Sequence, residues 1–341
     1  MVMKRITGRS VPNLVVAQRV IDKMAAAAAT HMEDETGEAM VGFYVPRQHP
    51  SGVPTLYALD TISPDDSAIR QFHTFQQGDD RQDDLIWWLQ ENWRVQREKN
   101  GTFLTKMLGS KWDVPLRYLG DWHKQPGFMI QPSGGDLMTA IDWIDDEDNN
   151  TDFLLAPIVT LDHPHTIVPS NVTTNFLMVP QASGDAMRVD FWYIDKNAHG
   201  FLPIAPTIYP NDQLPTLAEY PWHLVDDARF TRENDALQAE QLFVSVTLYD
   251  TDETPPLEVC YLVGRMGGDK LLIIATKADY PKSAPKVRVA PFIHMGEDDD
   301  MYKVFEQAWK SSTPLDLHFD WTADHLLIDV IKAAEEKLQK Q

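Results

Sequence analysis

Apolar residues recur at two spacings along this chain, and the two spacings predict a mixture of helices and strands. Steps of three and four residues predict an amphipathic helix over residues 11–31. Its buried side would carry Leu14, Ala17, Ile21 and Met24. A second helix is predicted over residues 83–98, where two acidic residues at the start favour a helix N-terminus.

Shorter apolar runs predict strands in the same part of the chain. They cover residues 38–46, 53–62, 115–121, 153–161, 175–179 and 187–194. Strands mixed with long helices indicate an α/β or α+β arrangement, in which helices flank a mixed sheet.

Two globular regions are predicted, at residues 11–205 and 229–338. Residues 206–228 lie between them and contain Pro206, Pro210, Pro215 and Pro221. Because proline at this density resists helix and central strand, this segment is predicted to be an extended linker.

The second region has its own pattern, which indicates an α+β domain. Helices are predicted at its two ends, over 229–241 and 321–338, and strands over 242–249, 258–263 and 270–276.

Composition and charge narrow the classes of partner. The chain is 43% hydrophobic and has a net charge of −21, a field that repels phosphate backbones, so nucleic acid is not expected to bind. No apolar run reaches the roughly 18 residues of a membrane span, so no membrane partner is expected either.

Cys260 is the single cysteine and is flanked by apolar residues. This fits a buried strand residue in a reducing cytoplasm.

Residues 120–136 carry the densest set of chemically capable side chains. His123 is followed by Gln125 and Pro126, and then by Ser133 and Asp136. The proline and nearby glycines favour a turn, so the imidazole and the carboxylate can converge on one point. A hydroxyl at 133 is also well placed to cap a helix that continues to residue 144.

This spacing resembles the JAMM/MPN zinc metalloproteases, whose signature is His-x-His-Pro, six residues, and Ser-x-x-Asp. Only Gln125 departs from it, at the position of the second histidine. The family also has an upstream glutamate before a glycine-containing apolar strand, and the spacing to Gly42 points to Glu35 rather than Glu38. The resemblance covers roughly residues 11–205.

The resemblance implies a role for each residue. His123 and Asp136 would bind zinc, with Gln125 at the remaining ligand position. Glu35 would accept a proton from the attacking water, and Ser133 would help to hold the developing oxyanion. Zinc lowers the pKa of water to roughly 7, and a nearby carboxylate can carry the proton onward.

The glutamine leaves several readings open, because a neutral amide is a poor substitute for imidazole. Gln125 could bind zinc weakly, or His73, His163 or His165 could complete the site. The pocket could also be inactive and retained for binding, and a deliberately inactivated site would look the same. A serine hydrolase using Ser133 is not favoured, because the Gly-x-Ser-x-Gly elbow is absent. The acidic run 145–148 is predicted to be a solvated helix end or turn, and the run 297–300 an exposed loop.

Residues 279–287 contain Tyr280, Pro281, Pro285 and a Lys-Val pair, and this run resembles a segment of the ubiquitin-conjugating-enzyme (UBC) fold. Active members of that family have a cysteine after this segment. Here Cys260 precedes it, so the second region resembles the cysteine-less UBC and RWD-like modules that bind proteins.

These resemblances together imply a cytoplasmic zinc metallo-isopeptidase, or a weakened descendant, that acts on conjugates of a ubiquitin-like protein. The alternative is a non-catalytic scaffold or adaptor that binds ubiquitin-like proteins through two degenerate domains. Stoichiometric zinc in the purified protein would separate the two hypotheses.

Overall fold

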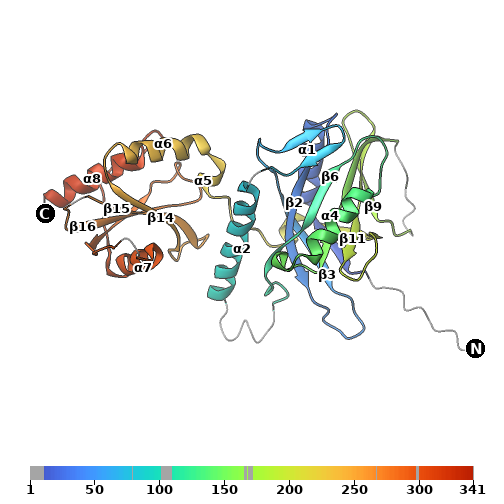
Figure 1. The fold of residues 1–341 in the computed structure, drawn as a ribbon, viewed down its shortest axis with the longest axis horizontal. Helices are drawn as coiled ribbons and strands as arrows, with labels where there is room; N and C mark the ends of the chain where they lie inside the picture. Colours follow the sequence, from blue (N-terminus) through green and yellow to red (C-terminus); the bar gives the residue numbers. More distant parts are fainter. Residues whose placement is uncertain are drawn as a thin grey trace, which may run out of the picture. The chain divides into compact units, whose positions relative to one another are not determined.

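The computed structural model describes residues 11–78, 80–100, 110–164, 167, 172–265, 267–296 and 299–340. The chain splits into two compact units, Met1–Leu217 (unit 1) and Ala218–Gln341 (unit 2) (Figure 1). Each unit combines helices with its own sheet, so the predicted mixed α and β content is confirmed.

Unit 1 is built on an eight-stranded sheet in the order β13-β1-β3-β2-β6-β8-β10-β9. These strands are β1 (Asn13–Ala17), β2 (Gly37–Val45), β3 (Thr55–Ile62), β6 (Leu116–Lys124), β8 (Ile158–His163), β9 (Phe176–Pro180), β10 (Ala186–Asp190) and β13 (Pro206–Tyr209). Strand β1 runs parallel to both of its neighbours, β13 and β3. Strand β2 is antiparallel to β3 and β6, and β6 is parallel to β8.

Helices and smaller sheets complete unit 1. Helix α1 (Gln18–Thr30) packs on β1, β2, β3 and β8, and α2 (Arg81–Asn100) packs on β3 and β6. The other elements are α4 (Gly134–Asp145), β4 (Ile69–Gln71), β5 (Thr74–Gln76), β7 (Phe153–Leu155), β11 (Trp192–Asp195), β12 (Leu202–Pro203) and the 3-10 turns Glu147–Asn149 and Asn211–Gln213.

Several elements differ from the sequence prediction, and each difference has a physical reason. Residues 13–17 form a strand instead of the first turn of a helix, because the run Leu14-Val15-Val16 is buried between two parallel partners. The predicted linker 206–228 is also wrong at its start, since β13 pairs with β1 and belongs to unit 1. Proline is tolerated there because β13 is an edge strand.

Unit 2 is a five-stranded antiparallel sheet in the order β14-β15-β16-β17-β18, with helices on both faces. Its strands are β14 (Phe243–Asp250), β15 (Leu257–Gly264), β16 (Lys270–Thr276), β17 (Lys286–Pro291) and β18 (Thr313–Pro314). Its helices are α5 (Trp222–Val225), α6 (Asp227–Gln238), α7 (Met301–Ser311) and α8 (Leu327–Gln339).

Alternation along β15 divides the core of unit 2 into two clusters. Val259, Tyr261 and Val263 pack with α6 and α8, whereas Cys260 and Leu262 pack with α7. Helix α7 was not predicted from the sequence. Asp300, assigned there to a loop, is its N-cap and accepts from the amides of Tyr302 and Lys303.

Gly120 shapes the strand that leads to His123. Its φ is +126°, and a Cβ added there would lie 2.2 Å from the carbonyl oxygen of Leu155. We therefore expect Gly120→Ala to destabilise unit 1 by about 1–3 kcal/mol. Urea unfolding followed by hydrogen exchange of the β6 amides measures this. Gly134→Ala is the matched control, because a Cβ there meets nothing within 4 Å; equal losses in both variants would contradict the argument.

Candidate metal and hydrolase site

The end of β6 holds the candidate histidine between two other strands. His123 pairs with Gly37 of β2 and with Ile158 of β8. The backbone continues this pairing past the strand, since the amide of Gln125 donates to the carbonyl of Val159 at 2.9 Å. The backbone at His123 is therefore held by pairing on both sides, and the imidazole is only 16% exposed.

Glu35 lies just before β2, where its amide donates to the carbonyl of Gln71 at 2.9 Å. Its side chain lines the same cavity as His123 and Asp136. Glu38 is instead a core residue, 4% exposed, and accepts hydrogen bonds from Ser63 and from the Trp122 indole. Of Glu35 and Glu38, only Glu35 is therefore placed to act in the cavity.

Asp136 is presented by the first turn of α4. Ser133 is the N-cap: its hydroxyl accepts from the Asp136 amide at 3.1 Å, and its own amide donates to the Asp136 carboxylate at 2.5 Å. The N-cap role of Ser133 was predicted, and the reciprocal bond from its amide makes a capping box that fixes the carboxylate. Oδ1 of Asp136 lies 3.7 Å from Nε2 of His123, so the two predicted ligands do converge.

Gln125 fills the third position and is 5% exposed. Both ends of its amide are satisfied when Nε2 donates to the carbonyls of Met129 (2.8 Å) and Gln131 (3.2 Å) and Oε1 accepts from Nε2 of His123 (3.1 Å). The amide atom that faces His123 is also 3.3 Å from Oδ2 of Asp136. The two backbone carbonyls thus turn the amide oxygen toward the shared point.

These three donors have the spacing of a metal site. Ligands about 2.0–2.2 Å from a tetrahedral zinc lie roughly 3.4 Å apart. The Gln125 amide atom is 3.1 Å from Nε2 of His123 and 3.3 Å from Oδ2 of Asp136, and the other Asp136 oxygen, Oδ1, is 3.7 Å from the same Nε2, so both carboxylate oxygens enter the comparison. The donor set is weak, however, because one member is a neutral amide. Zinc would also displace the proton from Nε2 of His123, which adds to the cost of binding.

Burial shifts two pKa values in directions that suit such chemistry. Burial lowers the pKa of His123, with Asp136 opposing it, so the imidazole is neutral at pH 7 and able to act as a ligand. Burial raises the pKa of Glu35, and the negative charge of Asp136 raises it further while Lys124 opposes. A carboxylate with a raised pKa is a stronger base.

The cavity has a volume of about 300 Å³, and part of its lining was not predicted from the sequence. Asp121, Gln77 and Tyr118 also line it, and the Tyr118 hydroxyl donates to Asp121 at 2.7 Å. A signal existed for Asp121: it precedes His123 by two positions in one strand, so strand alternation puts both on one face. Gln77 directly follows β5, distant in sequence from β6, and carries no comparable signal.

Asp121 predicts a pH dependence of stability. Burial raises the pKa of Asp121 from 3.8 to about 6, and the Tyr118 hydrogen bond only partly opposes this. Because the folded pKa is the higher one, the stabilisation is complete below pH 3.8 and is lost as the pH rises through about 6. Asp121→Asn should therefore stabilise unit 1 at pH 8 by up to about 3 kcal/mol.

The measurement is urea unfolding of both proteins between pH 4 and pH 8, with the β6 amides as reporters. The difference in free energy of unfolding between Asp121→Asn and the wild type should shrink steadily toward pH 4. An advantage that does not change with pH would show that the carboxyl titrates normally in the folded protein.

The other candidate histidines within the described residues do not complete the site. His73 and His163 do not line the cavity, and His163 instead packs its ring on Phe128 with centroids 4.7 Å apart. His165 lies outside the described residues. Within the described ranges, no three His, Cys, Asp or Glu side chains gather as a metal-binding group. The described side chain beside His123 and Asp136 is the amide of Gln125.

The lone cysteine of unit 2 is buried in β15 and 0% exposed, as predicted. Burial raises the pKa of the Cys260 thiol far above its ordinary value, which leaves it unreactive. Among the helices of the described residues, none is long and apolar enough to cross a membrane.

Comparisons with known proteins do not identify the chain. No protein-family model and no curated protein matches it. Among solved structures, a solution structure of a Desulfitobacterium hafniense protein aligns with 58% of this chain and 93% of its own, at 12% identity and a TM-score of 0.33. A likeness at that level supports no conclusion about fold or function.

Proposed function

We propose that unit 1 is a zinc-dependent peptidase or isopeptidase site of the JAMM type whose metal affinity is reduced by Gln125. The observation that carries the proposal is the triangle formed by His123, Gln125 and Asp136, with Glu35 in the same cavity. The substrate class would be a conjugate or fusion at the C-terminus of a ubiquitin-like protein.

Each residue has a defined task in this proposal. His123, Asp136 and the Gln125 oxygen would hold zinc, which supplies Lewis-acid activation of water and of the scissile carbonyl. Glu35 would hold the proton removed from water and deliver it to the leaving amine. Ser133 would act first as the cap that orients Asp136, since its hydroxyl already accepts from that amide.

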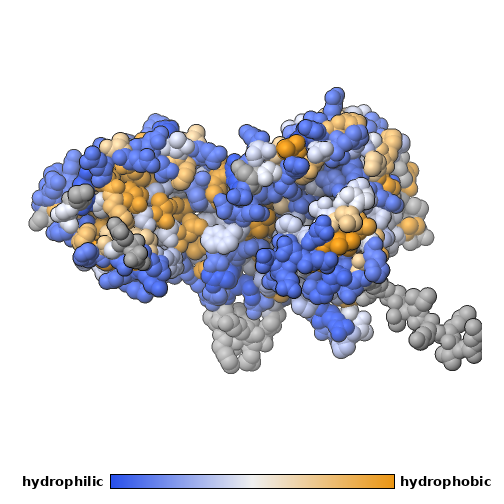
Figure 2. Space-filling view, in the orientation of Figure 1, coloured by the Kyte–Doolittle hydropathy of each residue, from blue (hydrophilic) through white to orange (hydrophobic). Residues whose placement is uncertain are grey.

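The surface around the cavity suits a polypeptide. Met138 and Trp143 on α4 are 59% and 40% exposed, and Phe128 in the preceding loop is 63% exposed. Apolar surface is visible over α4 in Figure 2, next to hydrophilic side chains. Apolar side chains beside a polar cleft favour an extended peptide chain over a small polar substrate.

Unit 2 would then hold a protein partner without catalysing transfer. The buried, inert Cys260 supports that role, because thioester chemistry needs an accessible thiolate. A lone unpaired cysteine also agrees with a reducing cytoplasm as the working compartment.

A scaffold without catalysis is the second candidate, and the amide at the ligand position favours it. In this case the hydrogen bond from His123 to Gln125 replaces the metal, and the cavity only binds a peptide tail. Hydrolysis would then be absent at every zinc concentration.

The test combines zinc titration of the purified full chain with cleavage of ubiquitin-like fusion proteins. Binding of one zinc and slow cleavage that Glu35→Gln abolishes, with zinc retained, would support the enzyme. Absence of both zinc and turnover would remove the enzyme and leave the scaffold.

A further inference from the structure

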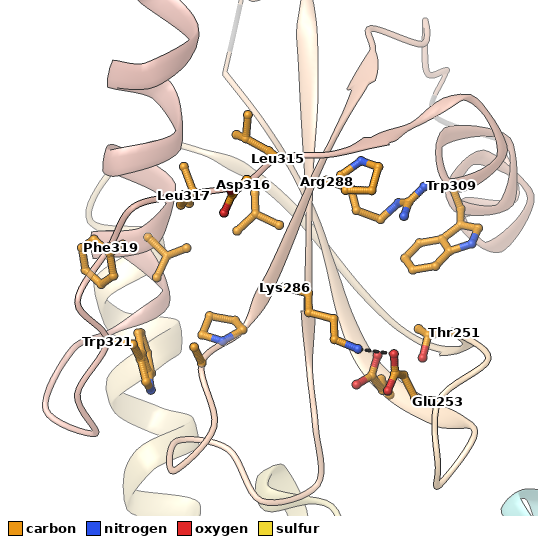
Figure 3. A pocket seen from close by; sticks show the side chains of 16 residues that line it. Thr251, Glu253, Lys286, Arg288, Trp309, Leu315, Asp316, Leu317, Phe319 and Trp321 are labelled. Carbon is orange, nitrogen blue, oxygen red and sulfur yellow. Dashed lines mark ion pairs between the residues drawn. The ribbon is translucent and has the colours of Figure 1, made fainter.

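A second cavity lies in unit 2, far in sequence from the candidate hydrolase site. It has a volume of about 570 Å³ and is lined by β17, the hairpin that joins β14 to β15, and the chain that follows β18. Figure 3 shows Lys286, Glu253 and Thr251 on one side of it, and Leu317, Phe319 and Trp321 on the other. The cavity therefore combines charged groups with apolar walls.

Glu258 lines this cavity and is unusual there because its carboxylate is buried without a partner among the described groups. The side chain is 2% exposed, and neither carboxylate oxygen accepts a hydrogen bond from any described group. The hydroxyl of Thr251, which lines the same cavity, is likewise buried and unpaired within the described chain. Leaving a buried carboxylate unpaired costs several kcal/mol, so a missing partner is expected here.

The nearby cations are engaged elsewhere. Glu258 lies two residues before Cys260 in β15 and therefore on the same sheet face. Cys260, Ala275 and Lys286 are successive cross-strand partners, so Lys286 shares this face. Its ammonium nevertheless forms an ion pair with Glu253 (Figure 3).

Arg288 is held by Ser312, with hydrogen bonds of 2.7 Å to the hydroxyl and 3.0 Å to the carbonyl. Its guanidinium also lies 4.6 Å from the centroid of the Trp309 ring. Among the described residues that line the cavity, neither cation is thus paired with Glu258.

We propose that this cavity binds an alkylammonium or guanidinium group carried on an apolar stem, with Glu258 as its counter-ion. The Thr251 hydroxyl would accept a second hydrogen bond from the same group. The ring of Trp309, on the same sheet face as Glu258, provides an apolar wall for the stem. A lysine or arginine side chain of a protein partner and a free small amine share this chemistry, and the net charge of −21 attracts both.

The experiment follows the indole resonances of Trp309 and Trp321 in the full chain labelled with 15N-tryptophan. The probes are n-butylammonium, agmatine and the N-acetylated methylamides of lysine and arginine; n-butanol has the stem of the first without its charge. We expect saturable shifts at roughly millimolar concentrations of the cations and none with the alcohol. Tighter binding of the amino-acid amides than of the free amines would assign the site to a protein side chain, and the reverse order to a small amine.

Two variants isolate the carboxylate. Glu258→Gln should weaken binding of each cation at least about tenfold. Glu336→Gln, which makes the same change on the exposed surface of α8, should leave binding unchanged.

Three results would overturn the proposal. One is the absence of saturable shifts with every cation, and another is unchanged binding by Glu258→Gln. The third is loss of folding stability in Glu258→Gln without any ligand, because that would mean that Glu258 has a partner within the chain.

Discussion

Replacing Gln125 by histidine should raise the zinc affinity of unit 1 by at least about 10–100-fold, the range known for smaller changes around metal ligands. The amide atom that faces His123 and Asp136 already lies 3.1 and 3.3 Å from their donor atoms. An imidazole there would replace a weak neutral donor with a strong one. If the proposed function is correct, cleavage of ubiquitin-like fusions should increase together with the zinc affinity.

Competition against a chelator of known affinity gives the zinc dissociation constants of both proteins. Gln131→His is the matched control, because Gln131 is exposed and does not line the cavity. Equal zinc affinities for wild type and Gln125→His, measured on the folded proteins, would contradict the three-donor site.

Replacing Glu233 by alanine should destabilise unit 2 by about 3–5 kcal/mol. Glu233 is 0% exposed and accepts from Nε of Arg229 at 2.7 Å, from the Tyr280 hydroxyl, and from the Leu327 amide at 2.8 Å. The variant would leave the Arg229 guanidinium, which is 4% exposed, without its counter-ion. It would also remove the acceptor of the Leu327 amide at the start of α8. Arg229, Tyr280 and α8 would thus lose the side chain that they all contact.

Urea unfolding followed by hydrogen exchange of the β15 and β16 amides measures this loss within the full chain. The control is Glu335→Ala, which removes a solvent-exposed ion pair with Arg265 and should cost no more than about 1 kcal/mol. Similar losses in the two variants would mean that the buried network adds nothing beyond a surface pair.

The sequence predicted most elements whose pattern is local. Strand β16 was placed at its observed bounds, and β2, β3, α2 and α6 were placed within a few residues. Local patterns suffice there because alternation or helical spacing coincides with the buried face. The Ser133 cap was also local, since its partner lies three residues ahead.

The missed features depend on contacts between distant parts of the chain. Residues 13–17 form a strand only because β3 and β13 supply parallel partners from elsewhere in the sequence. In the candidate site, convergence of His123, Asp136 and Glu35 was predicted, but the role of the Met129 and Gln131 carbonyls in turning Gln125 was not. No residue pattern reports which way a backbone carbonyl will point.

Anomalous diffraction at the zinc edge from crystals soaked in zinc tests the three-donor site most directly. The account predicts one strong peak about 2.0–2.2 Å from Nε2 of His123, the Gln125 amide oxygen and the Asp136 carboxylate. A saturating soak that leaves this point empty, or a peak that contacts neither His123 nor Asp136, would contradict it.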